Sequence, residues 1–245
     1  MYKKFAQFYD YIPLNSFTHI IMEFIHANQI PVQKVLDLGC GTGSFLLELV
    51  KEGITGTGID ISKDMIAVAR AKAEKIAARE MVEFQVASIV DFNLNQTYDL
   101  VTSNLDTINH LLTEEEVRRA FLNARRHLND NGIFYFDLHT ATGLRSWVYQ
   151  ANIHNENLVR FLHGTFNEEI QIGTLHIEAF LRVNPRVPIY IRHIETVHEK
   201  AYPLSSILAW LGDAGFTETK PIGPDSGLSV EEMETRGRCF FCAVK

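Results

Sequence analysis

Residues 34–43 read Lys-Val-Leu-Asp-Leu-Gly-Cys-Gly-Thr-Gly, and this stretch decides the fold. It is a short apolar run that ends in a turn with glycine at every second position, and residues 44–52 continue with helical periodicity. A strand that passes through a glycine turn into a helix lets the backbone approach a ligand closely and aims free N–H groups at it. The stretch therefore predicts the first strand and helix of a ligand-binding α/β sheet.

Alternating strands and helices follow this turn. Four more short apolar runs predict strands at 54–60, 82–86, 99–103 and 133–138. A helix is expected at 63–80 with Ser62 as its N-cap, and a second one opens with a capping sequence at Thr113. Alternating β and α units are typical of a parallel sheet with helices on its faces, so the fold class is α/β.

Two segments depart from this alternation. Residues 1–30 hold two amphipathic stretches, which predict an N-terminal helical cap against the core. Residues 152–202 change to period-two alternation with a proline-containing turn at 184–188, which predicts an antiparallel hairpin insertion over the active site. A helix at 204–214 and an apolar C-terminal strand resume the earlier rhythm. We therefore expect one domain, 1–245, that carries a cap and an insertion.

The composition and net charge of the chain limit the classes of partner that it is expected to bind. Hydrophobic residues make up 46% of the chain and charged residues 22%, which is typical of a globular protein. A formal net charge of −7 creates no field that would attract nucleic acid or an anionic membrane. No apolar run approaches membrane-spanning length, and no secretory h-region follows the N-terminal lysines. We therefore expect a cytoplasmic protein that binds neither nucleic acid nor membrane.

The three cysteines do not indicate a metal site. Cys239 and Cys242 lack the second Cys or His pair that a zinc site needs, and they lie in an apolar run that predicts a buried strand. Residues three apart on a strand point to opposite faces. We therefore interpret both as core thiols and expect no metal.

The glycine spacing and two carboxylates separate two kinds of cofactor. Gly39, Gly41 and Gly43 are one residue tighter than the fingerprint of dinucleotide enzymes, and the preceding Asp37 suits an amine better than a phosphate. Asp60 ends the second predicted strand, where an acid can accept hydrogen bonds from ribose hydroxyls. The pattern favours a nucleoside with a positively charged tail, and an NAD-dependent oxidoreductase is the alternative.

Three motifs taken together resemble one family. Residues 35–43 (VLDLGCGTG), 58–62 (GIDIS) and 98–101 (YDLV) resemble the first, second and fourth motifs of class I S-adenosylmethionine-dependent methyltransferases of the small-molecule type. The resemblance covers residues 34–138 well and residues 204–244 in outline, but not the insertion. It implies a doubly wound, Rossmann-like, mostly parallel sheet of seven strands with the last antiparallel, and S-adenosylmethionine as the cofactor.

The resemblance also implies roles for particular residues. Asp37 and the turn Gly39-Cys40-Gly41 would hold the amino-acid end of the cofactor, Asp60 and Ile61 the ribose, and Met65 the adenine. Ser88 and Ile89 would flank the base, and Asn104 and Leu105 would border the methionine. The family commonly has an Asp where this chain has Ser88, and a serine there can also serve simply as a loop cap.

Two tyrosines near the N-terminus are candidates for contact with the sulfonium. Tyr9 and Tyr11 follow a segment that often closes over the cofactor in small-molecule members of the family, and an aromatic face stabilises a cation. Tyr11 is also a catalytic candidate. Packing of the cap onto the core is the alternative for each of the two tyrosines.

The substrate candidates lie in two places. Asn109 and His110 follow the fourth motif, and His139 follows a central strand, at the sheet edge where α/β folds bind ligands. In the insertion, strand alternation places Arg192 and His198 on one face, which would suit an acidic acceptor with His198 as the base. Loop bracing, or a solvent-exposed sheet face, is the alternative for each of these residues.

The sequence thus predicts methyl transfer from S-adenosylmethionine to a small-molecule acceptor. Displacement at a sulfonium methyl mainly needs alignment of nucleophile and methyl, and a general base helps only when the nucleophile arrives protonated. His198, His110 and Tyr11 are the catalytic candidates. A binding module without turnover stays an alternative, and the protein is expected to be a monomer or a homodimer.

Overall fold

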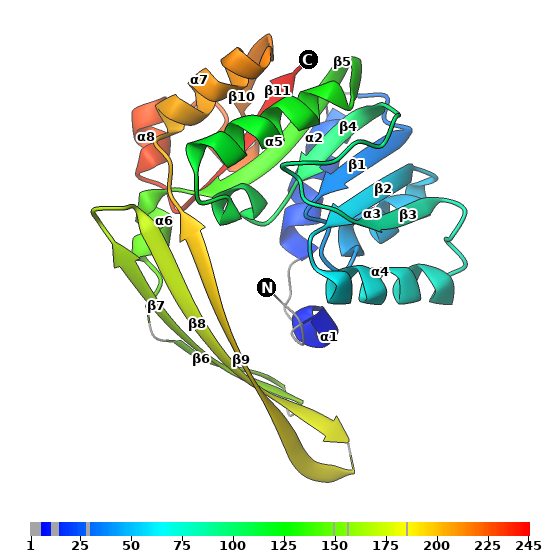
Figure 1. Ribbon diagram of the computed structural model, residues 1–245, viewed down its shortest axis with the longest axis vertical. Coiled ribbons are helices and arrows are strands. Elements are labelled where there is room, and N and C mark those ends of the chain that lie inside the picture. The colour runs from blue at the N-terminus through cyan, green and yellow to red at the C-terminus, as the bar shows by residue number, and fades with distance from the viewer. Residues whose placement is uncertain (1–5, 11–14, 28–29, 149, 156, 185) are drawn as a thin grey trace.

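The computed structural model describes residues 6–10, 15–27, 30–148, 150–155, 157–184 and 186–245. A layered α/β body is joined to a long, twisted antiparallel sheet that extends away from it (Figure 1). The short helix α1, Ala6–Tyr9, lies between the two parts (Figure 1). No helix in the described ranges is long and apolar enough to cross a membrane.

A seven-stranded sheet in the order β10-β11-β5-β4-β1-β2-β3 forms the centre of the body. Its strands are β1 Lys34–Leu38, β2 Thr55–Asp60, β3 Val82–Val86, β4 Tyr98–Ser103, β5 Leu128–His139, β10 Glu218–Pro221 and β11 Arg238–Val244. Only β11, the last strand, pairs antiparallel with its neighbours β5 and β10. This confirms the predicted doubly wound sheet with an antiparallel last strand, and it brings the start of β11 to the edge where β5 ends.

Two hydrophobic cores sandwich this sheet. One packs α5, Glu114–Arg126, and α7, Leu204–Ala214, against one face through Phe121, Trp210 and their neighbours. The other packs α2, Asn15–Ala27, α3, Ser44–Leu49, and α4, Lys63–Lys75, against the opposite face. Removal of apolar surface from water drives both layers together.

The remaining helices are short: η1 Val50–Glu52, η2 Thr107–His110, α6 Ala141–Arg145, η3 Gly223–Asp225 and α8 Val230–Glu234.

Local sequence signals set the helix starts. Ser62 accepts a hydrogen bond from the backbone N–H of Met65, and Thr113 forms a complete capping box with Glu116, as the sequence predicts. Helix α4 ends at Lys75, earlier than the expected 80, because Ala77 adopts the left-handed conformation with φ 55° and turns the chain.

The two C-terminal cysteines lie on opposite faces of the sheet. Cys239 is buried in the core that contains α5 and α7, whereas Cys242 is buried in the core that contains α2, α3 and α4. Both are free thiols on β11. They are core residues, as the strand periodicity predicts.

The insertion is a four-stranded antiparallel sheet in the order β6-β7-β8-β9. Its strands are β6 Gln150–Asn155, β7 Leu158–Asn167, β8 Ile172–Asn184 and β9 Val187–Lys200. The expected hairpin is the β8–β9 pair, whereas β6 and β7 were not predicted as separate strands. Leu158, Ile177, Ala179 and Val197 form a small core on one face, and Tyr9 packs against it. That face is therefore turned toward α1 and the body.

Candidate functional site

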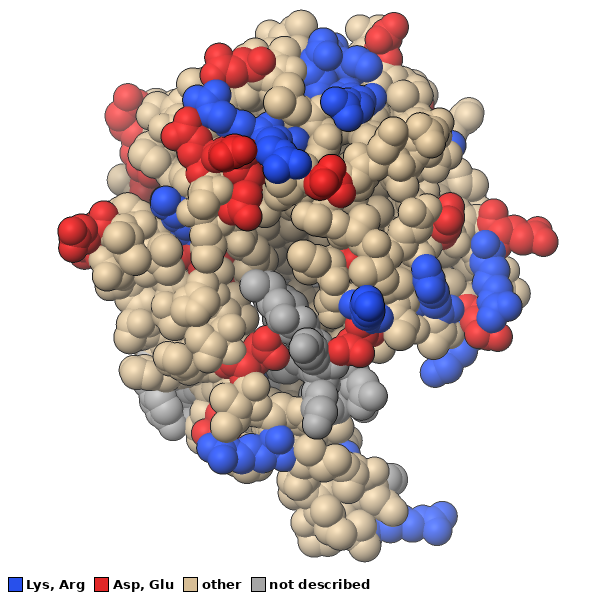
Figure 2. Space-filling model, in the orientation of Figure 1, with Lys and Arg blue, Asp and Glu red and all other residues tan. Residues whose placement is uncertain are grey.

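A cavity of about 780 Å³ lies at the carboxyl ends of β1, β2, β4 and β5. Its walls come from the glycine turn after β1, the loop after β4, helix α1 and the inner face of the insertion. Figure 2 shows the molecule hollowed between the body and the insertion. A cavity of this size at this edge is typical of a small-molecule site in an open α/β sheet.

The turn after β1 depends on glycine. Gly39 has φ 76° and Gly41 has φ 53°, values that residues with a Cβ rarely adopt. A Cβ on Gly39 would lie 2.5 Å from Cγ2 of Thr107, so the loop after β4 packs directly on the turn. The N–H groups of Gly39 and Cys40 both donate to the carbonyl of Ile59, which ties the turn to β2. Together with Cys40 between them, these glycines line the cavity.

Asp37 lies buried under the turn, at the end of β1. It accepts hydrogen bonds from Oγ1 of Thr102 at 2.7 Å and from Nδ2 of Asn104 at 3.1 Å. Burial raises the pKa of Asp37 to about 7, although both hydrogen bonds oppose the shift. A cation that binds beside a buried carboxyl group of raised pKa stabilises the ionised form of that group.

Asp60, at the end of β2, faces the same cavity. Its two oxygens accept hydrogen bonds from the N–H groups of Gly41 at 2.9 Å and Ser62 at 2.7 Å. Burial raises the pKa of Asp60, and the two N–H groups oppose that shift. Each carboxylate oxygen has a second lone pair for another donor. Next to it, Ile61 is 66% exposed at the rim, while Met65 is buried in the wall.

The remaining predicted cofactor residues come from two loops. Ser88 and Ile89 line the cavity after β3, and Oγ of Ser88 also accepts a hydrogen bond from the N–H of Val90 at 3.3 Å. Asn104 and Leu105 line it after β4. Leu105 has φ 56°, a strained value for a branched residue, and its N–H donates to Oδ1 of Asp137 at 2.6 Å. Such strain is held in place by the surrounding contacts.

Helix α1 contributes Tyr9 to the cavity, where a Cβ on Gly41 would lie 3.9 Å from the Tyr9 ring. Burial raises the pKa of the Tyr9 hydroxyl well above its ordinary value, so this side chain stays neutral. The next residue, Asp10, anchors α1: it pairs with Nζ of Lys72 at 2.8 Å and accepts hydrogen bonds from Thr42 and Ser44. Tyr11, the other predicted aromatic contact, lies outside the described residues.

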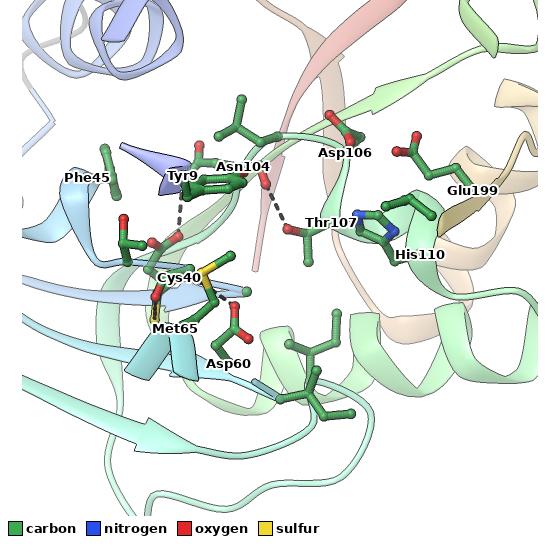
Figure 3. Close-up of a pocket in the computed structure, with 18 of the residues that line it drawn as sticks. Tyr9, Cys40, Phe45, Asp60, Met65, Asn104, Asp106, Thr107, His110 and Glu199 are labelled. Carbon is green, nitrogen blue, oxygen red and sulfur yellow. Dashed lines mark hydrogen bonds between the residues drawn. The ribbon is translucent and has the colours of Figure 1, made fainter. Parts of the chain in front are cut away.

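A cluster of charged groups occupies the other end of the cavity. Arg238, the first residue of β11, pairs with Asp106 and Asp137 and donates a hydrogen bond to Nε2 of His139 at 2.8 Å. Nδ1 of His139 in turn lies 2.9 Å from Oε2 of Glu199. Figure 3 shows Asp106 and Glu199 together, at the end of the cavity away from Met65, with Tyr9 between.

The protonation states in this cluster follow from burial and charge. Burial lowers the pKa of His139 to about 4, so its ring is neutral near pH 7. Burial and the neighbouring Asp106 carboxylate raise the pKa of Glu199 well above its ordinary value. Burial also opposes ionisation of Asp106, but Arg238 outweighs it and lowers the pKa of that carboxyl. The cluster therefore contains an ionised Asp106 beside a proton-holding Glu199.

Asp106, His139 and Glu199 are also residue types that commonly bind metal ions. Ligand atoms of Asp106, His139 and Glu199 lie within 4.8 Å of one another. Arg238, however, already pairs with Asp106 and donates to Nε2 of His139. A guanidinium beside two of the three ligands repels a metal ion, so the donor set favours a charged network.

The predicted face of β9 is the wrong one. His198 and Arg192 are exposed on the outer face, where His198 contacts Thr174 and Arg192 pairs with Glu178. Val197 and Glu199, one position away, line the cavity instead. Because side chains alternate on a strand, an error of one residue moves the whole functional face to solvent.

The other substrate candidates lie in or near the cavity. His110 and His139 line it. Asn109 is buried beneath it and holds the backbone of His139 at 2.9 and 2.8 Å and the carbonyl of Lys200 at 2.9 Å. Asn109 therefore ties the end of β5 to the end of β9, a bracing role like the alternative that the sequence left open.

Four residues line the cavity although the sequence did not predict them there: Glu199, Arg238, Trp147 and Arg160. Glu199 follows from the opposite phase of the same strand alternation. Arg238 could have been found only from the pairing of β11 with β5, in which it lies opposite His139. For Trp147 and Arg160 the sequence offers no motif, because their places depend on how the insertion packs.

A doubly wound seven-stranded sheet with a reversed last strand and a cavity at the glycine turn defines the class I methyltransferase fold. The family model of a methyltransferase domain matches residues 35–132. A protein of Geobacillus sp. (strain WCH70) that is named a methyltransferase is 30% identical over 100% of this chain and 99% of its own length. The chain therefore belongs to the methyltransferase family, and the oxidoreductase alternative is set aside.

Solved structures agree on the fold. An S-adenosylmethionine-dependent methyltransferase of Clostridium acetobutylicum ATCC 824 matches with a TM-score of 0.81 and 21% identity, over 99% of this chain and 98% of that one. A sugar N-methyltransferase of Streptoalloteichus sp. ATCC 53650 matches with a TM-score of 0.75 and 20% identity, over 98% and 92% of the two chains. Both matches include the insertion, which the sequence motifs did not cover.

Proposed function

We propose that this enzyme transfers the methyl group of S-adenosylmethionine to a small-molecule acceptor by in-line displacement. One observation carries the proposal: a single cavity joins the residues that suit this cofactor to the charged cluster of Asp106, His139 and Glu199. A cofactor and an acceptor in one enclosed space can be aligned for direct transfer. When bound, S-adenosylmethionine supplies an electrophilic methyl group on a positively charged sulfur.

The donor set on the body side fits this cofactor. Asp37 is a buried carboxyl that would pair with the ammonium of the amino-acid end, and Asp60 keeps lone pairs for two ribose hydroxyls. Met65 and Ile89 are apolar walls for a base, with Ser88 at its edge. Gly41 leaves open the space beside Tyr9 that a side chain would enter, and Gly39 lets the loop after β4 pack directly on the turn. These assignments, with Cys40, Ile61, Asn104 and Leu105 in the wall, are the cofactor side of the proposal.

On the acceptor side, Glu199 replaces His198 as the proposed base. It lines the cavity, and the residue is 3% exposed. Its raised pKa makes the ionised form a strong proton acceptor for an ammonium or hydroxyl nucleophile. His139 stays neutral and donates from Nδ1, which orients the Glu199 carboxyl. His110 is the second residue that could touch the acceptor.

A small acceptor is supported by the size of the cavity, about 780 Å³, and by the fold relative from Streptoalloteichus, which is named a sugar N-methyltransferase. We propose the same class of acceptor here, a metabolite rather than a macromolecule. The choice between monomer and homodimer and the cytoplasmic location stay predictions from the sequence.

Two measurements test the proposal together. Calorimetry should show binding of S-adenosylmethionine, with much lower affinity in Asp60→Ala because a two-oxygen contact is lost. Incubation of a metabolite extract with methyl-labelled cofactor should then produce a labelled small molecule. Binding without any transfer would indicate a binding module, and tight binding of NAD in place of S-adenosylmethionine would contradict the site assignment.

A further inference from the structure

Arg160 is a charged residue on the wall that the insertion contributes to the cavity. It lies on β7 two residues from Leu158 and from Leu162, so all three share the inner face of the insertion. Arg160 and Leu162 line the cavity, as do Leu175, Ile177 and Val197 on the neighbouring strands. Directly across from Arg160 on β8 is Ala179, whose small side chain leaves room beside the guanidinium.

Among the described residues, no carboxylate pairs with the Arg160 guanidinium. Within the described parts of the chain, three cationic side chains line the cavity: Lys72, Arg160 and Arg238. Lys72 pairs with Asp10, and Arg238 pairs with Asp106 and Asp137. By contrast, Nε of Arg160 is buried and has no hydrogen-bond partner. Burial lowers the pKa of Arg160, although a guanidinium remains charged near neutral pH.

An unpaired, partly buried guanidinium is unfavourable in the free protein. Burial removes water from Nε, and no group in the described residues replaces the hydrogen bond that Nε loses. A ligand oxyanion would restore the missing hydrogen bonds, and a guanidinium presents its donors in the fork geometry that carboxylates and phosphates accept. The wall therefore has a ready site for one negative charge of a ligand.

The position of Arg160 would keep the negative charge of a ligand away from the Glu199 end of the cavity, where methyl transfer is proposed. Ala179 faces Arg160 on one side and His193 of β9 on the other, and Glu199 lies six residues further along β9. Six residues of a strand span roughly 20 Å. Leu162, Ile177 and Val197 line the cavity between the two ends. An acceptor held by Arg160 would thus extend an apolar part along the sheet toward Glu199.

We propose that Arg160 binds an oxyanion of the methyl acceptor, so that the acceptor is an organic acid or phosphate ester methylated at an atom remote from its anionic group. This inference rests on the proposed function and names its substrate class. It also replaces the earlier expectation that Arg192 recognises an acidic acceptor, because Arg192 is exposed and paired with Glu178 on the outer face.

The test separates metabolites by charge. A metabolite extract is passed over a strong anion exchanger at about pH 11, where most amines are neutral and carboxylates and phosphates stay charged. The retained and unretained fractions are neutralised and incubated with the enzyme and methyl-labelled S-adenosylmethionine. We expect labelled product from the retained fraction. Pretreatment with phosphatase tells the two oxyanions apart: loss of the acceptor indicates a phosphate, and survival indicates a carboxylate.

Matched variants connect the acceptor to Arg160. Arg160→Gln should lower the labelling rate at limiting acceptor at least tenfold, Arg160→Lys should lower it less, and Arg192→Gln on the outer face of the same sheet should leave it unchanged. A readout without turnover uses S-adenosylhomocysteine in place of the cofactor. Ultrafiltration with the wild-type enzyme should then retain the anionic acceptor, and Arg160→Gln should not retain it.

Cofactor affinity and the midpoint of thermal unfolding of each variant show that it is folded. The inference is overturned by an acceptor found in the unretained fraction, by equal rates in Arg160→Gln and wild type, or by a product that releases its label as methanol in mild alkali, since that label sits on the anion itself. Methylation of neither fraction by an enzyme that binds S-adenosylmethionine would indicate a binding module, and the inference would then fall together with the proposed transfer. Failure to bind S-adenosylmethionine is a different result and contradicts the proposed function.

Discussion

Oε2 of Glu199 lies 2.9 Å from Nδ1 of His139, although the two residues belong to different sheets. His139 ends β5 of the body, and Glu199 stands one residue before the end of β9 of the insertion. The contact joins the insertion to the body at the cavity wall. It also places a carboxyl group of raised pKa where an acceptor would lie.

Glu199→Gln is therefore expected to lower kcat at least tenfold, with little change in cofactor affinity. The amide keeps the shape of the carboxyl group but cannot take a proton. The wild-type rate should rise with pH as Glu199 ionises, and this rise should be absent from the variant. His139 does not produce the rise, because its pKa of about 4 lies below the range tested. A pH profile shared by both enzymes would assign the base elsewhere.

Asp37 predicts a pH dependence of cofactor binding. The cofactor's ammonium pairs with the ionised carboxylate, and the pKa of Asp37 in the free protein is about 7. Affinity for S-adenosylmethionine should thus fall as pH drops from 8 to 6, because binding must release a proton. Calorimetry of wild type and Asp37→Asn measures this. The variant should bind weakly at every pH, without the same slope.

Asp37 also predicts a pH dependence of folding stability, and its direction is opposite to that of cofactor affinity. The pKa of Asp37 is higher in the folded protein than in the unfolded chain. Its contribution to the free energy of unfolding therefore falls as the pH rises from the unfolded pKa near 4 through about 7. In the absence of cofactor, Asp37→Asn should raise the free energy of unfolding by roughly 1–3 kcal/mol at pH 8 and by little at pH 4. Denaturant unfolding at the two pH values checks this. An equal effect at both would show that ionisation is not the cause.

Gly39 and Gly53 form a matched pair for the turn. Both have positive φ, 76° and 80°, so alanine at either one costs about 1 kcal/mol of backbone strain. At Gly53 a Cβ meets nothing within 4 Å, whereas at Gly39 it would collide with Thr107. Gly39→Ala should therefore be the more destabilising variant and should weaken cofactor binding at least tenfold. Gly53→Ala should leave cofactor affinity within twofold of wild type, and equal losses would contradict the role of the turn.

Tyr9 predicts a difference between two cofactor forms. If its ring faces the sulfonium, Tyr9→Ala should weaken S-adenosylmethionine binding about tenfold. S-adenosylhomocysteine has a neutral sulfur and should be affected much less, while Tyr9→Phe should keep both affinities. Competition binding with the two ligands measures the ratio. Equal weakening of both would mean that Tyr9 only packs α1 against the insertion.

Much of the site followed from local pattern. Residues 34–43 predict β1 and its turn, because a buried strand and positive-φ glycines are local requirements. The caps at Ser62 and Thr113 form as expected for the same reason. Motif spacing then brings Asp37 and Asp60 to one edge, since parallel strands end together there. The sequence by itself therefore determined the fold class and the body side of the cavity.

Only the tertiary structure decided the acceptor side. Strand alternation divides the residues of β9 between two faces but does not say which face is inner, and the prediction took the face of His198, whereas Glu199 on the other face lines the cavity. The inner face is chosen by the packing of Leu158, Ile177, Ala179 and Val197 with Tyr9, contacts that join distant parts of the chain. Arg238 and Arg160 likewise reach the cavity through strand pairing. Such contacts leave no local signal, because hydrophobic burial depends on what the fold brings together.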